Sequence, residues 1–170
     1  EENLKTNFDN REAVVRFYSE KDDMYYTGSF PVALPRKISY PEITMQESAD
    51  LQELRAMRPR GSIALDWSYL PASYRENGEN IIPRLLLAVD TKTGVIMDAQ
   101  MLSPADDPCA ALFDMISHIS WNYAKPATIE ICDAEIEGII ADFCKQVGIR
   151  LVAKKQIKTI TQARKMYLGR

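Results

Sequence analysis

The chain has 170 residues, of which 46% are hydrophobic and 26% are charged, and its formal net charge is −3. This composition is that of an ordinary globular protein and excludes a disordered chain or a coiled coil. The best apolar run, residues 85–89, is much shorter than the roughly 20 residues that a membrane-spanning helix needs. We therefore expect a soluble domain that does not contact a membrane.

The first 60 residues carry the weakest pattern. The segments "AVVRFYS" and "MYYTGSF" flank a turn-like acidic stretch and favour a β-hairpin, although a short helix from Arg11 fits the same residues. Three prolines, at positions 31, 35 and 41, then predict an extended linker. A capping box, Thr44-Met-Gln-Glu47, predicts a helix over residues 45–57. We expect residues 1–60 to be an N-terminal extension.

The pattern is clearer from residue 61 onward. Residues 62–70 alternate between two faces, and residues 84–90 form an uninterrupted apolar run, so both predict strands. A loop with Asp90 and Gly94 predicts a hairpin into a third strand over residues 95–102. Helical spacing follows over residues 112–123 and 134–148, with strands at 127–132 and 149–154 and a last helix at 159–168.

The resulting order is β-β-β-α-β-α-β-α. Helices between the third, fourth and fifth strands are right-handed crossovers, which make those later strands parallel. This order resembles the ribonuclease H-like fold, a mixed five-stranded α/β sheet with spatial order 3-2-1-4-5. We therefore predict a ribonuclease H-like domain over residues 61–170.

A second resemblance lies in three short segments of the sequence. The segments "WSYLPA", "IIPRLLLAVDTKTGVI" and "KPATIEICD" are similar to those of an uncharacterised family of bacterial domains of unknown function. This resemblance implies a bacterial domain, often one part of a longer chain, and no activity comes with it. Three cysteines, an odd number, and the absence of an Asn-x-Ser/Thr acceptor favour the cytoplasm. The first residues, Glu-Glu-Asn, lead us to expect a processed or trimmed chain.

The ribonuclease H-like resemblance implies a site for two divalent cations, Mg²⁺ or Mn²⁺, held by carboxylates. Asp66 falls on the first strand and Asp133 at the end of the fourth, so parallel pairing would bring them together. Asp114, on the first helix, is the candidate for a third ligand. The integrase-like branch needs an acid on the last helix, but "TITQARKMYLGR" contains only basic charges.

A structural reading competes with the catalytic one. Asp133 is a natural N-cap, and the two glutamates that follow it in "CDAEIEG" complement the helix dipole. Asp90 is expected to bond its own turn. His118, four residues after Asp114, forms an ordinary helix-surface pair, and no nucleotide-binding glycine motif or zinc knuckle is present in the sequence.

Charge is unevenly distributed along the chain. From residue 143 to the end there are eight basic residues and no acidic ones, whereas the rest carries 13 basic and 24 acidic residues. Such a segment can track phosphates, or it can be a solvated helix face. The candidates for nucleic-acid contact are Lys154, Lys155, Lys158, Arg164 and Lys165.

The leading hypothesis is a non-catalytic or degenerate ribonuclease H-like domain that acts as an interaction module, with a protein or further domains of a longer chain as partner. No cofactor is expected under it. One alternative is a divalent-metal nuclease that uses Asp66, Asp133 and Asp114. Another is a nucleic-acid-binding module that uses the basic C-terminal segment.

Overall fold

A computed structural model describes residues 12–31, 39–43 and 49–168 of the chain. The contacts divide the chain into two compact units, residues 1–38 and residues 39–170. In the first unit, β1 (Glu12–Ser19) and β2 (Met24–Pro31) pair as an antiparallel hairpin, at the place where the sequence favours one. The predicted capping box and the proline at position 35 lie outside the described residues.

The second unit contains a mixed five-stranded sheet. Its helices and strands are α1 (Ala49–Ala56), β3 (Ser62–Tyr69), β4 (Tyr74–Glu76), β5 (Glu79–Ile81), β6 (Arg84–Asp90), β7 (Ile96–Leu102), α2 (Pro108–Asn122), β8 (Thr128–Ile131), α3 (Ala134–Val147), β9 (Arg150–Ala153) and α4 (Lys158–Leu168). The strand order is β7-β6-β3-β8-β9. β3 pairs antiparallel with β6 and parallel with β8. This is the predicted 3-2-1-4-5 order, so the ribonuclease H-like fold is confirmed.

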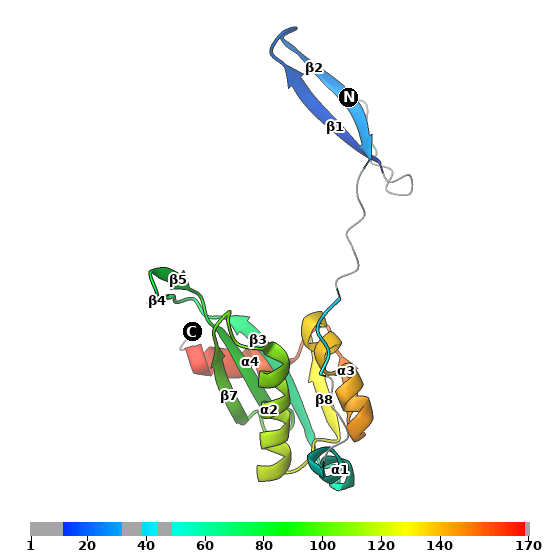
Figure 1. The fold of residues 1–170 in the computed structure, drawn as a ribbon, viewed down its shortest axis with the longest axis vertical. Coiled ribbons are helices and arrows are strands. Elements are labelled where there is room, and N and C mark those ends of the chain that lie inside the picture. Colours follow the sequence, from blue (N-terminus) through cyan, green and yellow to red (C-terminus); the bar gives the residue numbers. More distant parts are fainter. Residues whose placement is uncertain (1–11, 32–38, 44–48, 169–170) are drawn as a thin grey trace. The chain divides into compact units, whose positions relative to one another are not determined.

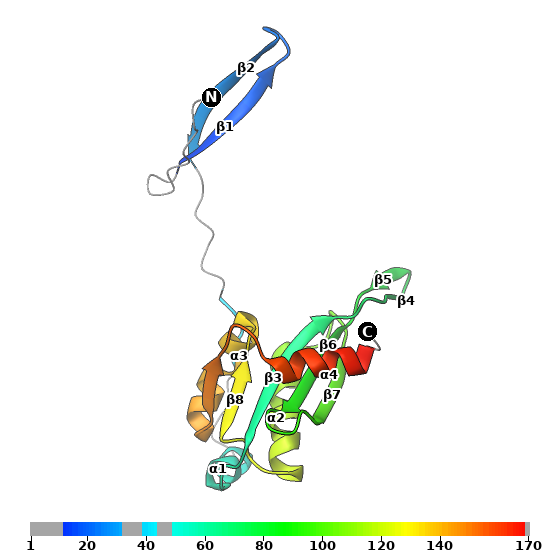
Figure 2. The ribbon, with the colours of Figure 1, turned by 180° about the vertical axis from the view of Figure 1, so that it is seen from behind.

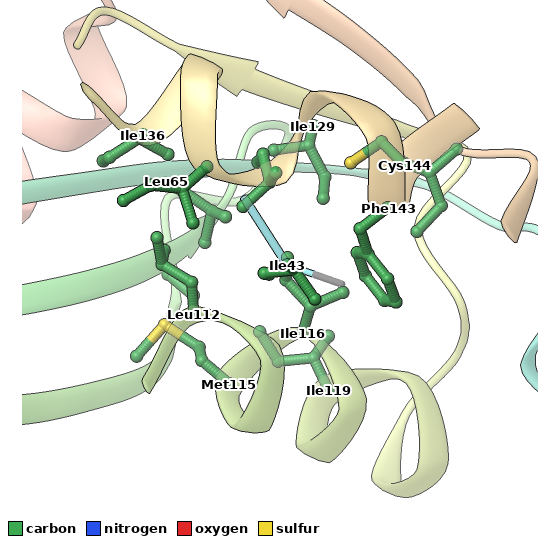
Figure 3. Close-up of a cluster of buried hydrophobic side chains, with 14 of the residues drawn as sticks. Ile43, Leu65, Leu112, Met115, Ile116, Ile119, Ile129, Ile136, Phe143 and Cys144 are labelled. Atoms are coloured by element: carbon green, nitrogen blue, oxygen red, sulfur yellow. The ribbon is translucent and has the colours of Figure 1, made fainter. Parts of the chain in front are cut away.

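Helices cover both faces of this sheet. α2 and α3 lie on one face and α4 crosses the other, as the two opposite views show (Figures 1 and 2). The main core lies beneath α2 and α3, where Leu65, Ile116, Ile129 and Phe143 are among the fully or almost fully buried side chains (Figure 3). A smaller cluster under α4 is built from Ala64, Val89, Ile157, Ile160 and Ala163. The α4 face is therefore the thinner of the two.

The chain's own capping chemistry fixes the ends of the helices. Asp107 is the N-cap of α2 and accepts from the Cys109 amide. Gly148 ends α3 with φ of 73°, a left-handed conformation that costs glycine no steric clash. Asp90 behaves as predicted, because its Oδ1 accepts from Lys92 and Thr93 in the β6–β7 turn. Local sequence therefore sets these boundaries.

The segment that precedes the sheet is tied to α3. The Ile43 amide donates to the Ile139 carbonyl at 3.1 Å, and Ile43 is buried in the main core. A Cβ on Gly138 would lie 2.6 Å from Tyr40, so this glycine is what allows Tyr40 to approach the helix. Residues 39–43 and α1 thus belong to the second unit. The division into domains 1–60 and 61–170 stays a prediction.

Two details differ from the sequence predictions. The loop after β3 contains a short hairpin, β4–β5, whose turn residues Asn77 and Gly78 both have positive φ. His118 pairs with Asp98 of β7 at 2.9 Å and not with Asp114. Among the described residues, no helix is long and apolar enough to cross a membrane.

Candidate functional site

Two of the predicted carboxylates meet at one end of the sheet. β3 and β8 run parallel with Leu65 opposite Ile131, so Asp66 and Asp133 follow at the same edge. Burial is the main influence that raises the pKa of Asp66, and the negative charge of Asp133 adds to it. The parallel pairing of these strands therefore produces the convergence that the topology predicts.

The carboxylate of Asp66 is already paired with a basic side chain of the same chain, that of Arg164. The side chain of Asp66 is only 8% exposed, and Arg164 of α4 donates to its Oδ2 from Nε at 2.7 Å and also from Nη2. The same guanidinium donates to the Trp67 carbonyl at 3.4 Å. Burial raises the pKa of Asp66 above its usual range, and Arg164 opposes that rise.

Asp133 is committed to a structural role. Its Oδ1 accepts from the amides of Glu135 at 2.7 Å and Ile136 at 3.2 Å, which makes it the N-cap of α3. Glu135 and Glu137 occupy the first turn of that helix, as a favourable interaction with the helix dipole requires. The predicted structural reading of the "CDAEIEG" stretch thus describes its local hydrogen bonds.

Asp114 does not join this pair. It is exposed on α2, which covers the opposite face of the sheet from α4, and it has no hydrogen bond or ion pair with another described residue. Within residues 12–31, 39–43 and 49–168, no three His, Cys, Asp or Glu side chains are grouped so that they could hold a metal ion. The structure therefore brings together two of the three predicted ligands.

The residue that sequence reasoning missed is Arg164 as a partner of Asp66. From the sequence alone, Arg164 is a candidate for nucleic-acid contact. The signal was present, because Ile160 and Arg164 are four residues apart and so share one face of α4, and Ile157 comes directly before the helix. That face is the one that packs on β3 and β6. An arginine on the helix face that packs against a sheet needs an acidic partner on that sheet, and Asp66 of β3 is this partner.

The remaining basic candidates fall into two groups. Lys154 pairs with Glu130 of β8 at 2.7 Å. Lys155, Lys158 and Lys165 are exposed and have no side-chain partner among the described residues. Of the predicted basic residues, therefore, only Lys155, Lys158 and Lys165 offer a positive charge that has no partner among the described residues.

The aromatic residues near this corner divide between core and surface. Trp67 is buried, and the Arg84 guanidinium lies 4.4 Å from the centre of its ring. Arg84 also pairs with Glu135 at 3.5 Å. Tyr69 and Tyr74 are exposed. The Arg84 side chain thus covers Trp67 and links β6 to the first turn of α3.

Comparison with known proteins places the chain in a family. Residues 50–168 match the model of the domain of unknown function DUF6930, and the chain therefore belongs to this family. The comparison with curated proteins gave no match.

Solved structures of low identity are similar to part of the chain. The HTLV-2 integrase catalytic core domain in complex with magnesium is 12% identical, with 62% of this chain and 65% of that chain covered and a TM-score of 0.43. The simian T-cell lymphotropic virus intasome in complex with PP2A regulatory subunit B56 gamma is 9% identical over 76% of this chain and 43% of that chain, with a TM-score of 0.45. The Mos1 strand transfer complex is 11% identical over 73% and 47%, with a TM-score of 0.37. The chain spans slightly less than two thirds of the HTLV-2 chain and about half or less of the other two.

Proposed function

We propose that this member of the DUF6930 family is a non-catalytic, degenerate ribonuclease H-like domain that serves as an interaction module in a bacterial cytosolic protein. The observation that carries the proposal is the ion pair between Asp66 and Arg164. A metal-dependent nuclease needs its carboxylates to face a divalent cation. Here a guanidinium is fixed on the central carboxylate by two hydrogen bonds.

The other carboxylates support the same reading. Asp133 uses Oδ1 to cap α3, and Asp114 lies on a separate helix surface. If Mg²⁺ or Mn²⁺ bound at this corner, Asp66 and Asp133 would be its ligands, and it would polarise a phosphate and activate water. Both hydrogen bonds from Arg164 end on Oδ2 of Asp66, so an ion at this carboxylate would lie beside the positive charge of the guanidinium. Arg164 thus opposes the binding of a divalent cation.

A nuclease assay tests the non-catalytic part. Plasmid DNA and single-stranded RNA are incubated with the purified chain and millimolar Mn²⁺, with Asp66→Asn as the matched control. We expect the chain and the control to give the same background. Cleavage that requires Mn²⁺ and disappears in Asp66→Asn would overturn the proposal and support the nuclease alternative, which the closeness of Asp66 and Asp133 favours.

The first unit supports the interaction part. Strand alternation places Val15, Phe17, Tyr26 and Phe30 on one face of the β1–β2 hairpin, where each is between 41% and 48% exposed. Phe17 stacks on Tyr26 and meets Phe30 edge to face. Since an isolated two-stranded hairpin is marginally stable in water, an apolar face of this kind suits contact with a protein partner.

Hydrogen exchange on the free chain checks this reading of the hairpin. Without a partner, the amides of β1 and β2 should exchange far faster than those of β3 and β6, because the side chains of β2 are largely exposed and those of β3 and β6 are largely buried. Protection of the hairpin equal to that of the central strands would show that its apolar face is already covered within the chain, and would count against the interaction role.

Nucleic-acid binding through the basic C-terminal segment is a distinct proposal. It now rests on Lys155, Lys158 and Lys165, since Lys154 and Arg164 have partners. Binding to generic DNA or RNA would fall steeply as salt rises. The absence of binding at low salt would end this alternative without touching the interaction proposal.

A further inference from the structure

A second buried charged group, the ammonium of Lys125, belongs to a residue that lies beside the start of β3. Lys125 is 3% exposed, and its Nζ donates to the carbonyls of Arg55 at 3.1 Å and Val147 at 3.0 Å. These carbonyls come from the C-terminal ends of α1 and α3, whose dipoles favour a cation. An ammonium has three donors, and the third has no acceptor among the described residues. Burial lowers the pKa of Lys125, as expected for a cation without a full counter-charge.

Two arginines line a hollow that Lys125 also lines. The hollow has a volume of about 260 Å³, and Arg58, Arg60, Lys125, Ser120 and Tyr123 are among its lining residues. The arginines follow α1, and the Arg60 amide donates to the Lys125 carbonyl at 2.8 Å, which fixes the loop beside the lysine. Neither guanidinium contacts a carboxylate within the described part of the chain. Three basic residues therefore line one hollow.

A second hollow adjoins the first and has a different character. Its volume is about 250 Å³, and it shares Arg60, Tyr123 and Ala124 with the first. The rest of its lining includes the apolar residues Met97 and Pro126 and one acidic residue, Asp90, which favours the phosphate in the first hollow and not in this one. Each hollow alone is smaller than the roughly 300–1,000 Å³ of typical ligand pockets, and the two reach that range only together. α1, the end of α2 and the start of β3 meet at this end of the sheet (Figure 1).

We propose that these paired hollows form a binding site for a small phosphate ester, with the phosphate beside Arg58, Arg60 and Lys125 and the organic group beside Tyr123. The planar fork of arginine matches phosphate oxygens in two parallel hydrogen bonds, and a buried ammonium is stabilised by a counter-ion. The exposed ring of Tyr123 offers a face on which a planar group can stack. The size of the site fits a mononucleotide and not a polymer.

A purely structural role for Lys125 explains less. Capping of α1 and α3 accounts for two of its three donors, but not for two arginines that lack an acid and line the same hollow. The two readings differ in which substitution matters. A helix cap depends on Lys125 alone, whereas a phosphate site depends on the exposed arginines, whose replacement leaves the buried core intact.

Isothermal titration calorimetry of the whole chain at low salt tests the site. The probes are adenosine monophosphate, inorganic phosphate and adenosine, and the variants are Arg58→Gln with Arg60→Gln and, as a control of equal charge change, Lys155→Gln with Lys165→Gln. We expect adenosine monophosphate to bind more tightly than phosphate, and adenosine to bind more weakly than both. The double arginine variant should lose at least about tenfold to a hundredfold in affinity, which is the worth of a single charge-assisted hydrogen bond and so a lower bound for two arginines.

Several results would overturn the proposal. These are the absence of any heat from adenosine monophosphate and phosphate at millimolar concentration, equal affinity for adenosine and its monophosphate, and an equal loss in the lysine control. An unchanged affinity in the arginine variant would do the same. A circular dichroism melt of both variants shows that they are folded, and the exposed positions of these side chains lead us to expect melting temperatures equal to that of the unmodified chain.

Discussion

Replacement of Arg164 by methionine should destabilise the domain in a way that depends on pH. The substitution leaves the carboxylate of Asp66, whose side chain is 8% exposed, without its partner. Removal of one member of a buried ion pair costs about 3–5 kcal/mol, because the other charge stays buried. Arg164 is itself 37% exposed and its interaction is partly screened, so we expect about 2 kcal/mol at neutral pH.

The sign of the pH dependence follows from the raised pKa of Asp66. Burial raises this pKa above its ordinary value of 3.8, so ionisation of Asp66 costs the folded state more than the unfolded state. The stability that the neutral carboxyl contributes is complete below the ordinary value and is lost as pH rises through the folded-state value. Without Arg164, which opposes the rise, the pKa increases further. The cost of the substitution is therefore largest at neutral pH and shrinks as pH falls toward 3.8.

Urea unfolding followed by tryptophan fluorescence measures this effect at several pH values. The matched control is the double variant Asp66→Asn with Arg164→Met, which removes the buried charge and should recover most of the loss at neutral pH. A double-mutant cycle then isolates the coupling between the two residues. A cost below about 0.5 kcal/mol, the level of an ordinary surface substitution, or a cost that is the same at acidic and neutral pH, would refute a buried and dependent Asp66.

Three further substitutions test the local contacts by urea or thermal unfolding. Asp133→Ala should cost about 1 kcal/mol through loss of the α3 N-cap, and Asp133→Ser should restore most of it; equal stability of the two would contradict the capping role. Asp90→Ala should cost about 1 kcal/mol at neutral pH, because its turn hydrogen bonds are lost. The hydrogen bonds from Thr93 lower the pKa of Asp90, so this cost is present above pH 3.8 and disappears as pH falls through the lower folded-state pKa. Lys125→Met should cost about 2 kcal/mol, since two buried carbonyls lose their donor, and a neutral effect would show that water replaces it.

The fold could be predicted because its signals are local. The alternation of Ile63, Leu65 and Trp67 against Asp66 set a strand, and Gly94 and Gly148 marked a turn and a helix end. Crossover handedness then fixed the strand order without any knowledge of side-chain contacts. The β4–β5 hairpin was missed for the opposite reason. Its strands have three residues each, too short for alternation to register, although Asn77-Gly78 is a strong turn signal.

The candidate site was only half predictable, because its decisive contact spans 98 positions of sequence. Strand order alone placed Asp66 beside Asp133, since parallel neighbours share an edge. No local pattern says which residue of α4 comes to rest on Asp66, because that depends on where the helix crosses the sheet. The sequence did show that the last helix has only basic charges, which removed a third acidic ligand. In the structure one of those basic residues, Arg164, is paired with Asp66. The last helix therefore lacks an acid and also neutralises the carboxylate that a cation would need.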